Sequence, residues 1–268
     1  MSYTGNDWAL YAEHRTALTR ALLASAPTNG GRLCILGAGK CNDVDLEQLA
    51  EVFSEIHLVD IDPSAVASAV ARQSPDVRAR LRPHVPVDLS GLSNKRLGKW
   101  QRKAPTRGEL EAFETTTLAG IVARLPGPFD VVASACILTQ LSFALRQALG
   151  EKHPLLAPIR AAVMTTHLRV LLALTRVGGN VLFASDVVSS TSYDFDALPA
   201  ERDLGAVLRE IETNGTSYFA ANPKRIKDAL RYTDLVDHAA EPEELTPWLW
   251  TGPLDRTYLV YALRFEKV

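Results

Sequence analysis

Small residues followed by an acid at a fixed distance are the first sign of chemistry in this chain. Gly37, Ala38 and Gly39 follow a short apolar run. Asp60 comes 23 positions after Gly37, at the end of the next apolar run. Tiny side chains at the end of a parallel strand let a ligand approach the backbone, and a carboxylate at the end of the next strand can accept hydrogen bonds from ribose hydroxyls. The spacing therefore predicts a site for a cofactor that contains a nucleoside.

Two classes of cofactor and one structural alternative fit these residues. A dinucleotide fingerprint has a third glycine three residues after the second, and Asn42 occupies that position. This weakens the hypothesis of an NAD-dependent oxidoreductase, although Asp60 would suit the ribose of either cofactor. Without any ligand, the glycines would make a tight turn from strand to helix.

The elements that must position these residues alternate between strand and helix along the chain. Asp62-Pro63 supplies an N-cap and a first-turn proline for the helix after the second strand. A long helix is expected to close at Gly178-Gly179. The alternation predicts an α/β protein with a Rossmann-like, doubly wound, mostly parallel sheet in a single domain over residues 1–268. The expected strands are the apolar runs at 32–36, 56–61, 83–89, 129–135, 180–185 and 257–265.

Two segments stand outside this alternation. Residues 1–31 form an N-terminal helical segment, because residues 8–24 place apolar side chains on one helical face. Residues 91–128 lack a regular pattern and form an insertion between the third and fourth strands. Within the insertion, residues 94–107 hold six basic side chains, no acid, and Trp100.

The basic segment 94–107 has three interpretations. With Trp100 as a stacking surface, it would suit the phosphates and bases of RNA or DNA. The formal charge of the whole chain is only −2 and its pI is about 6.3, whereas a nucleic-acid module usually has a basic face. A solvated cationic lid or a pocket for an acidic small molecule is therefore preferred, and a small-molecule substrate is expected rather than a nucleic acid.

Composition sets the broad class of protein. The chain has 268 residues, of which 47% are hydrophobic and 22% are charged, so intrinsic disorder is not expected. The longest uncharged stretch, 131–145, is too short for a membrane span. The first fifteen residues contain acids where a secretory signal would be basic and then apolar. We expect a cytoplasmic protein that does not enter a membrane.

Neither a disulfide framework nor a metal site is expected. Cys34, Cys41 and Cys136 are odd in number and lack the spacing of a CxxC motif. The six histidines are scattered, and no two stand at a metal-ligand spacing. The sequence therefore predicts free thiols and no bound metal.

Taken in order, the motifs resemble those of the S-adenosylmethionine-dependent methyltransferase superfamily, whose members have a Rossmann-like seven-stranded sheet. That family ends its sheet with an antiparallel strand, and residues 258–265 stand in that place. The resemblance covers roughly residues 32–268 and depends on the order of the motifs. The matching segments are 36–39, 59–62, 129–136 and 177–183.

The resemblance implies a role for each matching position. Gly37, Ala38 and Gly39 would let the methionine part of the cofactor pass over the loop. Asp60 would hold the ribose hydroxyls, and Ile61 would pack on the adenine. The other implied contacts are Asp88 and Leu89 at the adenine, and Ser134, Ala135 and Cys136 at the methionine end.

Some positions depart from the family's pattern or have an ordinary structural alternative. The family usually has an acid where this chain has Ile35, and Cys41 replaces its third glycine. Asn42 and Asp43 could instead supply polar contacts from the start of the next helix. Asp88 could equally cap a turn.

No paired constellation of residues identifies a catalytic group. Methyl transfer needs mainly positioning and exclusion of water, and it needs a general base only where the acceptor must lose a proton. Tyr11, His14 and Asp186 are the candidates that could face the acceptor. Tyr11 and His14 could instead belong to the packing stripe of the first helix.

The sequence favours transfer of a methyl group from S-adenosylmethionine to an unidentified acceptor, with a small molecule preferred. Two alternatives stay open: a nucleoside-binding protein of the same fold without turnover, and an NAD-dependent oxidoreductase. The departures at Ile35 and Cys41 motivate the first, and Asp60 is compatible with the second. These motifs specify no oligomeric state.

Overall fold

The structure is a computed structural model that describes residues 8–199, 201–218, 221–252 and 256–268. The strands are β1 (Arg32–Leu36), β2 (Glu55–Val59), β3 (Leu81–His84), β4 (Phe129–Ala135), β5 (Thr175–Ser189), β6 (Glu243–Glu244), β7 (Trp248–Gly252) and β8 (Arg256–Glu266). The helices are α1 (Ala12–Ala24), α2 (Leu46–Val52), α3 (Pro63–Ala71), α4 (Pro75–Arg78), α5 (Asn94–Arg102), α6 (Arg107–Val122), α7 (Ile137–Leu149), α8 (Leu156–Leu174), α9 (Leu204–Asn214) and α10 (Pro223–Tyr232).

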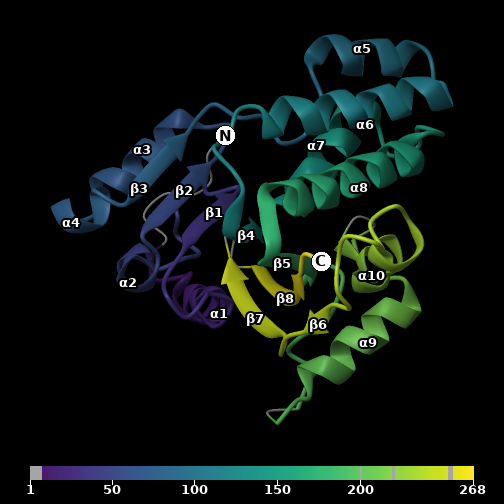
Figure 1. The fold of residues 1–268 in the computed structure, drawn as a ribbon. Coiled ribbons are helices and arrows are strands. Elements are labelled where there is room, and N and C mark those ends of the chain that lie inside the picture. The colour runs from purple at the N-terminus through teal and green to yellow at the C-terminus, as the bar shows by residue number, and fades with distance from the viewer. Residues whose placement is uncertain (1–7, 200, 219–220, 253–255) are drawn as a thin grey trace.

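Parallel strands form the central part of one mixed sheet (Figure 1). The strand order is β3-β2-β1-β4-β5-β8-β6, and β7 also pairs with β8. β1 pairs in parallel with β2 on one side and with β4 on the other. β8 runs antiparallel to β5, as predicted for the last strand. The predicted α/β fold with a doubly wound, mostly parallel sheet is therefore confirmed.

Helices cover both faces of the sheet and bury two cores (Figure 1). On the face that we call the α1 face, α1, α2 and α3 pack against strand residues such as Ile35 and Leu182. On the opposite face, the α8 face, helices α6 to α10 pack against residues such as Leu36 and Phe183. Ile35 and Leu36 are neighbours in β1, and Leu182 and Phe183 are neighbours in β5. Neighbouring residues of a strand point to opposite faces, so one member of each pair lies in each core.

Helix α8 owes its composition to its place in the core. Twelve of its nineteen residues are buried. By length and hydropathy alone this helix would suffice to cross a membrane. Its packing against α6, α7 and the sheet accounts for the apolar side chains instead.

The third strand is shorter and earlier than the predicted run 83–89. β3 ends at His84, because Pro86 has no N–H to donate to the sheet. Beyond it, Val87 N donates to Asp60 O at 2.8 Å, outside the regular ladder. His84 pairs with Val59, the last residue of β2, so the shorter β3 still flanks β2 to its end.

The glycine pair 178–179 lies inside a strand and does not close the long helix as predicted. α8 ends at Leu174, and β5 begins at the next residue and runs through both glycines. A Cβ on Gly179 would lie 2.8 Å from Asp130 O. Gly179 therefore lets β5 approach β4 closely, beside an irregularity in their pairing.

The insertion 91–128 contains α5 and α6, and α6 packs along α8. α6 starts at a capping box: Thr106 Oγ1 accepts from Glu109 N at 3.2 Å, and Glu109 Oε2 accepts from Thr106 N at 2.8 Å. Trp100 of α5 is only 2% exposed and meets Phe113 edge to face, with 5.5 Å between ring centroids. The less favoured interpretation of Trp100 as a stacking surface for bases does not hold, because the ring is part of the core.

Ion pairs reduce the charge of the basic segment 94–107. Lys99 pairs with Glu109 of α6. Arg107 pairs with Glu111 at 2.8 Å, one turn further along the same helix. Two of the six basic side chains of the segment are thus paired with acids of α6.

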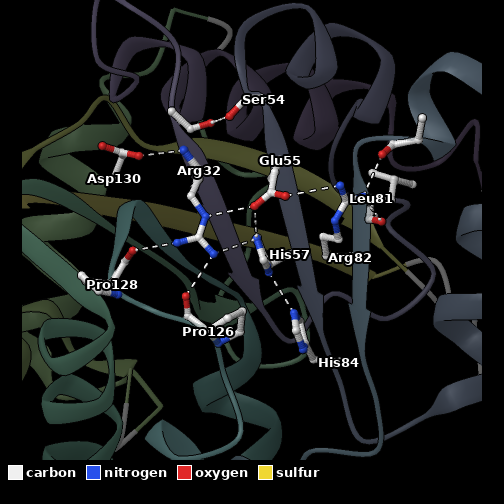
Figure 2. A network of polar contacts seen from close by, with 12 residues as sticks. Arg32, Ser54, Glu55, His57, Leu81, Arg82, His84, Pro126, Pro128 and Asp130 are labelled. Atoms are coloured by element: carbon white, nitrogen blue, oxygen red, sulfur yellow. Dashed lines mark hydrogen bonds and ion pairs between the residues drawn. The ribbon is translucent and has the colours of Figure 1, made fainter.

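A polar network joins β1, β2 and β3 on the α8 face, near the amino ends of the strands (Figure 2). His57 Nε2 lies 3.2 Å from Glu55 Oε2, and His57 Nδ1 lies 2.8 Å from His84 Nε2. His57 Nε2 thus faces the Glu55 carboxylate, which only accepts, and Arg32 Nη2 at 3.4 Å, which only donates, while Nδ1 faces the second imidazole. Glu55 also pairs with Arg32 at 3.0 Å and with Arg82 at 3.3 Å.

Acidification is expected to destabilise the fold through His57. Burial lowers the pKa of His57 to about 4, whereas an unfolded histidine has a pKa of about 6.5. Between these two values the unfolded chain binds the additional proton, so the stabilisation is complete above pH 6.5 and is lost as the pH falls toward 4. We expect this residue alone to lower the free energy of unfolding by about 2 kcal/mol between pH 7 and pH 5.

Urea unfolding at pH 7 and pH 5 measures this contribution. His57→Gln should remove it, because glutamine does not titrate. His238→Gln is the matched control, since His238 is exposed and should leave the acid sensitivity of the protein unchanged. Equal acid sensitivity in the wild type and in both variants would contradict the assignment to His57.

Candidate functional site

The carboxyl ends of β1, β2, β4 and β5 meet at one edge of the sheet (Figure 1). The chain leaves β1 toward β2 and returns to form β4 on the other side, so the loops after β1 and β4 leave in opposite directions. Such a reversal opens a crevice where α/β proteins bind ligands. Gly37, Asp60, Cys136 and Asp186 stand at or near these four strand ends.

The glycine loop after β1 is anchored to β2 by its backbone. Gly37 N and Ala38 N both donate to Val59 O, at 2.9 and 3.1 Å. Gly37 has a φ of 80° and Gly39 a φ of 49°, in the left-handed region that glycine adopts without strain. A Cβ on Gly37 would lie 2.7 Å from the Cβ of Ile137, whereas a Cβ on Gly39 would meet nothing within 4 Å. Gly37 therefore permits close packing of α7, and Gly39 borders open space.

The carboxylate of Asp60 joins this loop to the end of β2. Asp60 Oδ2 accepts from Gly39 N at 2.7 Å, and Asp60 Oδ1 accepts from Asp62 N at 2.9 Å. Each carboxylate oxygen has two acceptor positions, so Asp60 retains capacity for ribose hydroxyls. The neighbouring Ile61 is 61% exposed and offers an apolar surface beside that carboxylate. This pair has the chemistry required by the ribose and the base of a nucleoside.

The structure places the predicted adenine residues Asp88 and Leu89 differently from each other. Asp88 Oδ1 accepts from Ser90 N at 2.8 Å and from Ser90 Oγ at 2.6 Å, which is the turn-capping role given as its alternative. Asp88 is half-buried and its second oxygen remains able to accept. Leu89 is buried in the core of the α8 face, so only its backbone lies at the site.

The three residues predicted at the methionine end point mostly into the protein. Ser134 Oγ lies 2.8 Å from His167 Nε2, and both residues are buried. Ala135 is also buried. Cys136 has a φ of 50°, donates its N–H to Ala184 O at 3.0 Å and precedes α7. The site can therefore use the backbone of this segment, and the Ser134 side chain belongs to the core.

The two departures from the family's loop pattern have a physical explanation. Cys41 itself adopts the left-handed conformation that the missing glycine would have, with a φ of 50°, while its thiol is buried in the core of the α1 face. Ile35 is buried in the same core, where a carboxylate would be costly.

Asp43 supplies an acid from the loop, and sequence reasoning gave it only a general polar role. Burial raises the pKa of Asp43 to about 7, and the charge of Asp60 acts in the same direction. The charge of Asp43 also raises the pKa of Cys136, at the start of α7. Its position two residues after Cys41, at the end of the glycine loop, is the local signal that could have identified it.

Asp186 lies at the far end of the crevice and is 7% exposed. Thr139 Oγ1, in the first turn of α7, donates to Asp186 Oδ1 at 2.6 Å. The pairing of β5 with β8 is irregular between Asp186 and Val188, and such bulges are frequent beside active sites. Burial raises the pKa of Asp186 to about 6, and the hydrogen bond from Thr139 opposes this increase.

His14 and Tyr11, the other two candidates, belong to an aromatic cluster. Trp248 Nε1 donates to His14 Nδ1 at 2.9 Å, and the ring of Trp250 stacks on His14 at 4.6 Å. Trp250 also lies 5.0 Å from Tyr11 and 5.1 Å from Tyr258, between ring centroids. Burial lowers the pKa of His14 to about 3. His14 therefore packs as a neutral ring with one nitrogen engaged, which leaves Asp186 as the titratable candidate at the crevice.

Cys34, Cys41 and Cys136 are buried free thiols, as predicted, and burial raises the pKa of each. Among the residues that the structure describes, no three His, Cys, Asp or Glu side chains form a group that could hold a metal ion.

Comparisons with known proteins give likenesses to solved structures. No family model and no curated sequence matches the chain. The N-methyltransferase NodS from Bradyrhizobium japonicum WM9 is 17% identical, with 98% of this chain and 99% of that chain covered and a TM-score of 0.47. The magnesium protoporphyrin IX methyltransferase ChlM from Synechocystis PCC 6803 is 13% identical, with 97% and 84% covered and a TM-score of 0.49. An rRNA methylase from Streptococcus thermophilus is 11% identical, with 95% and 96% covered and a TM-score of 0.43. At these identities the likeness concerns the fold alone, and the fold assignment rests on the strand order and pairing described above.

Replacing each glycine of the loop by alanine should separate packing from backbone strain. Gly37→Ala should lower the free energy of unfolding by about 2–4 kcal/mol, because a left-handed backbone and a clash with Ile137 act together. Gly39→Ala should cost only about 1–2 kcal/mol, from the backbone term alone. Urea unfolding of the two variants measures the difference. Equal losses would show that Ile137 yields to the added methyl group.

Proposed function

We propose that this protein is an enzyme that transfers a methyl group from S-adenosylmethionine to a small-molecule acceptor. The observation that carries the proposal is the carboxylate of Asp60, which holds Gly39 N and Asp62 N while keeping acceptor positions for a ribose. The open side of Gly39 and the exposed Ile61 lie next to it. Ribose, base and the chain beyond the ribose would each meet a suitable surface.

The residues of the crevice fit this cofactor in charge as well as in shape. When bound, S-adenosylmethionine supplies a methyl carbon that is bonded to a positively charged sulfur. A nucleophile attacks this carbon in line with its bond to sulfur. Asp43, Asp60 and Asp186 bring negative charge to the crevice, and none of them forms an ion pair with another described residue. Arg15 donates to Asn42 O at 3.0 Å beside the loop, where it could pair with the carboxylate of the methionine part.

The start of α2 disfavours a dinucleotide. A pyrophosphate would be held by free N–H groups at a helix N-terminus. Here Asp45 occupies that terminus, with its carboxylate accepting from Glu47 N at 3.0 Å and from Gln48 N at 3.1 Å. Asn42, at the third glycine position of the fingerprint, is buried and accepts from Arg72 at 3.3 Å. Carboxylates at Asp43 and Asp45 would repel a pyrophosphate, which argues against NAD.

The acceptor is more compatible with a small molecule than with a nucleic acid. Trp100 is buried, and two of the basic residues near it are paired with acids. The crevice itself carries the negative charge of Asp43, Asp60 and Asp186, which would repel a phosphate backbone.

Calorimetric titration with S-adenosylmethionine, S-adenosylhomocysteine and NAD tests this proposal. We expect the first two to bind and NAD not to bind. Asp60→Ala should weaken both affinities roughly 10- to 100-fold, because hydrogen bonds to a charged acceptor are lost. Asp237→Ala, at an exposed position away from the crevice, is the matched control and should bind as the wild type does.

Three results would distinguish the alternatives. Binding of NAD alone would overturn the methyltransferase proposal. Wild-type affinity in Asp60→Ala, with an intact fold by circular dichroism, would remove Asp60 from the site. Cofactor binding without product from a broad panel of acceptors would favour the non-catalytic protein of the same fold.

A further inference from the structure

We infer that the acceptor is a small amine that enters protonated, and that Asp186 receives its proton before the nitrogen is methylated. This inference rests on the proposed methyl transfer and names the substrate class of the same crevice. It depends on where Asp186 lies, on which side chains share its face of the sheet, and on the charge that these side chains create.

Asp186 is held next to the segment that leads from the cofactor part of the crevice. Cys136 N donates to Ala184 O, so the end of β4 is tied to β5 two residues before Asp186. Thr139, in the first turn of α7, fixes Asp186 Oδ1 at 2.6 Å. One carboxylate oxygen is therefore oriented by α7. Among the residues that the structure describes, no other side chain donates a hydrogen bond to the second oxygen, which is the one able to accept a proton.

The pairing of β5 with β8 shows which side chains share the face of Asp186. Asp186 pairs with Val260, and Ser189 pairs with Tyr258. The bulge turns both Val187 and Val188 into the core of the α8 face, so Ser189 returns to the same face as Asp186. Tyr258, two residues from Val260 on β8, therefore also stands on the α1 face with Asp186.

Aromatic rings border this part of the crevice. Trp250 of β7 pairs with Tyr258 in the sheet, and their ring centroids are 5.1 Å apart. Tyr218 N donates to Val187 O at 2.9 Å, and the Tyr218 hydroxyl donates to Ser189 Oγ at 2.8 Å. Tyr218, Trp250 and Tyr258 are all half-buried, so their rings are partly accessible beside the carboxylate.

The charges around Asp186 favour a cation. Burial raises the pKa values of Tyr218 and Tyr258, and the negative charge of Asp186 raises them further, so both phenols stay neutral donors. The positive charge of the exposed Arg256 lowers the pKa values of both phenols. The negative charge of Asp186 also raises the pKa values of Cys136 and Tyr261, and the charge of Asp43 raises the pKa of Cys136. A carboxylate without an ion pair beside aromatic faces is a suitable environment for an ammonium group.

Proton transfer is more favourable from an amine than from an alcohol. The pKa of an alkyl ammonium is about 10, as in lysine, whereas the pKa of a hydroxyl is several units higher. The pKa of Asp186 is about 6. Its carboxylate can therefore accept a proton from an ammonium at moderate cost, whereas accepting one from an alcohol would be prohibitively costly. The charge of the ammonium also contributes to binding, which a neutral alcohol lacks.

The proposed reaction consists of a proton transfer to Asp186 followed by a methyl transfer to nitrogen. The ammonium gives one proton to the free oxygen of Asp186 and becomes a neutral amine with a lone pair. The nitrogen forms a bond to the methyl carbon as the carbon–sulfur bond breaks, and that electron pair stays on sulfur in S-adenosylhomocysteine. The product leaves as a methylated ammonium, and Asp186 releases its proton to water.

The test compares binding of amines and matched alcohols to the protein saturated with S-adenosylhomocysteine. The probes are benzylamine with benzyl alcohol, and phenethylamine with phenethyl alcohol, titrated by calorimetry at pH 7.5. We expect each amine to bind at least about tenfold more tightly than its alcohol, because only the amine carries a charge to pair with Asp186. Asp186→Asn should reduce this preference to about twofold or less.

Two controls keep this result separate from folding and from the cofactor. Asp186→Asn should bind S-adenosylhomocysteine within about twofold of the wild type, because the amide keeps the hydrogen bond from Thr139. Asp237→Asn, at an exposed position, should retain the full preference for amines.

Each outcome has one meaning. A wild type that binds S-adenosylhomocysteine without preferring amines, including one that binds neither probe, overturns the inference and leaves the proposed methyl transfer standing. A preference that survives in Asp186→Asn also overturns it. Failure of the wild type to bind S-adenosylhomocysteine instead overturns the proposed function itself.

Discussion

The hydrogen bond from Gly39 N to Asp60 Oδ2 is the contact on which the candidate site depends. It joins the loop after β1 to the end of β2, and the bonds from Gly37 N and Ala38 N to Val59 O anchor the same loop to the same strand. Left-handed backbone at the two glycines turns these N–H groups toward β2. The same carboxylate thus fixes the loop and keeps acceptor positions for a ligand, so loop shape and ligand affinity cannot vary independently.

This arrangement concentrates negative charge where the sulfonium of the proposed cofactor and the ammonium of the proposed acceptor would bind. Asp43 and Asp186 have pKa values raised mainly by burial, to about 7 and about 6, and Asp60 adds its charge to that of Asp43. Ionised carboxylates in such surroundings are costly until a cation is near them. A sulfonium near the loop would therefore lower the pKa of Asp43 as it binds, and the affinity for S-adenosylmethionine should rise with pH through the range in which Asp43 ionises.

The geometry of the glycine loop and its acid could be predicted because it depends on residues that are close in sequence. Gly37, Gly39 and Asp60 act through backbone conformation and through strand ends, which local patterns reveal. Cys41 could not be predicted, because its left-handed conformation is stabilised by burial of its side chain in a core formed by distant segments. Trp100 was misplaced for the same reason: its basic neighbours suggest a surface, and its burial depends on packing with α6 and α7.

The acceptor half comes from parts of the chain that are far apart, and this separation has a consequence for specificity. Asp186 stands on a bulge where the parallel part of the sheet meets the antiparallel β8. The rings near it come from the segment after α9 and from β7 and β8, while α1 packs behind Trp250. None of these segments contacts Asp60 through a hydrogen bond in the described structure. Substitutions at Tyr218, Trp250 or Tyr258 would therefore reshape the proposed acceptor site while the proposed cofactor loop keeps its geometry, so acceptor choice would change without loss of cofactor binding.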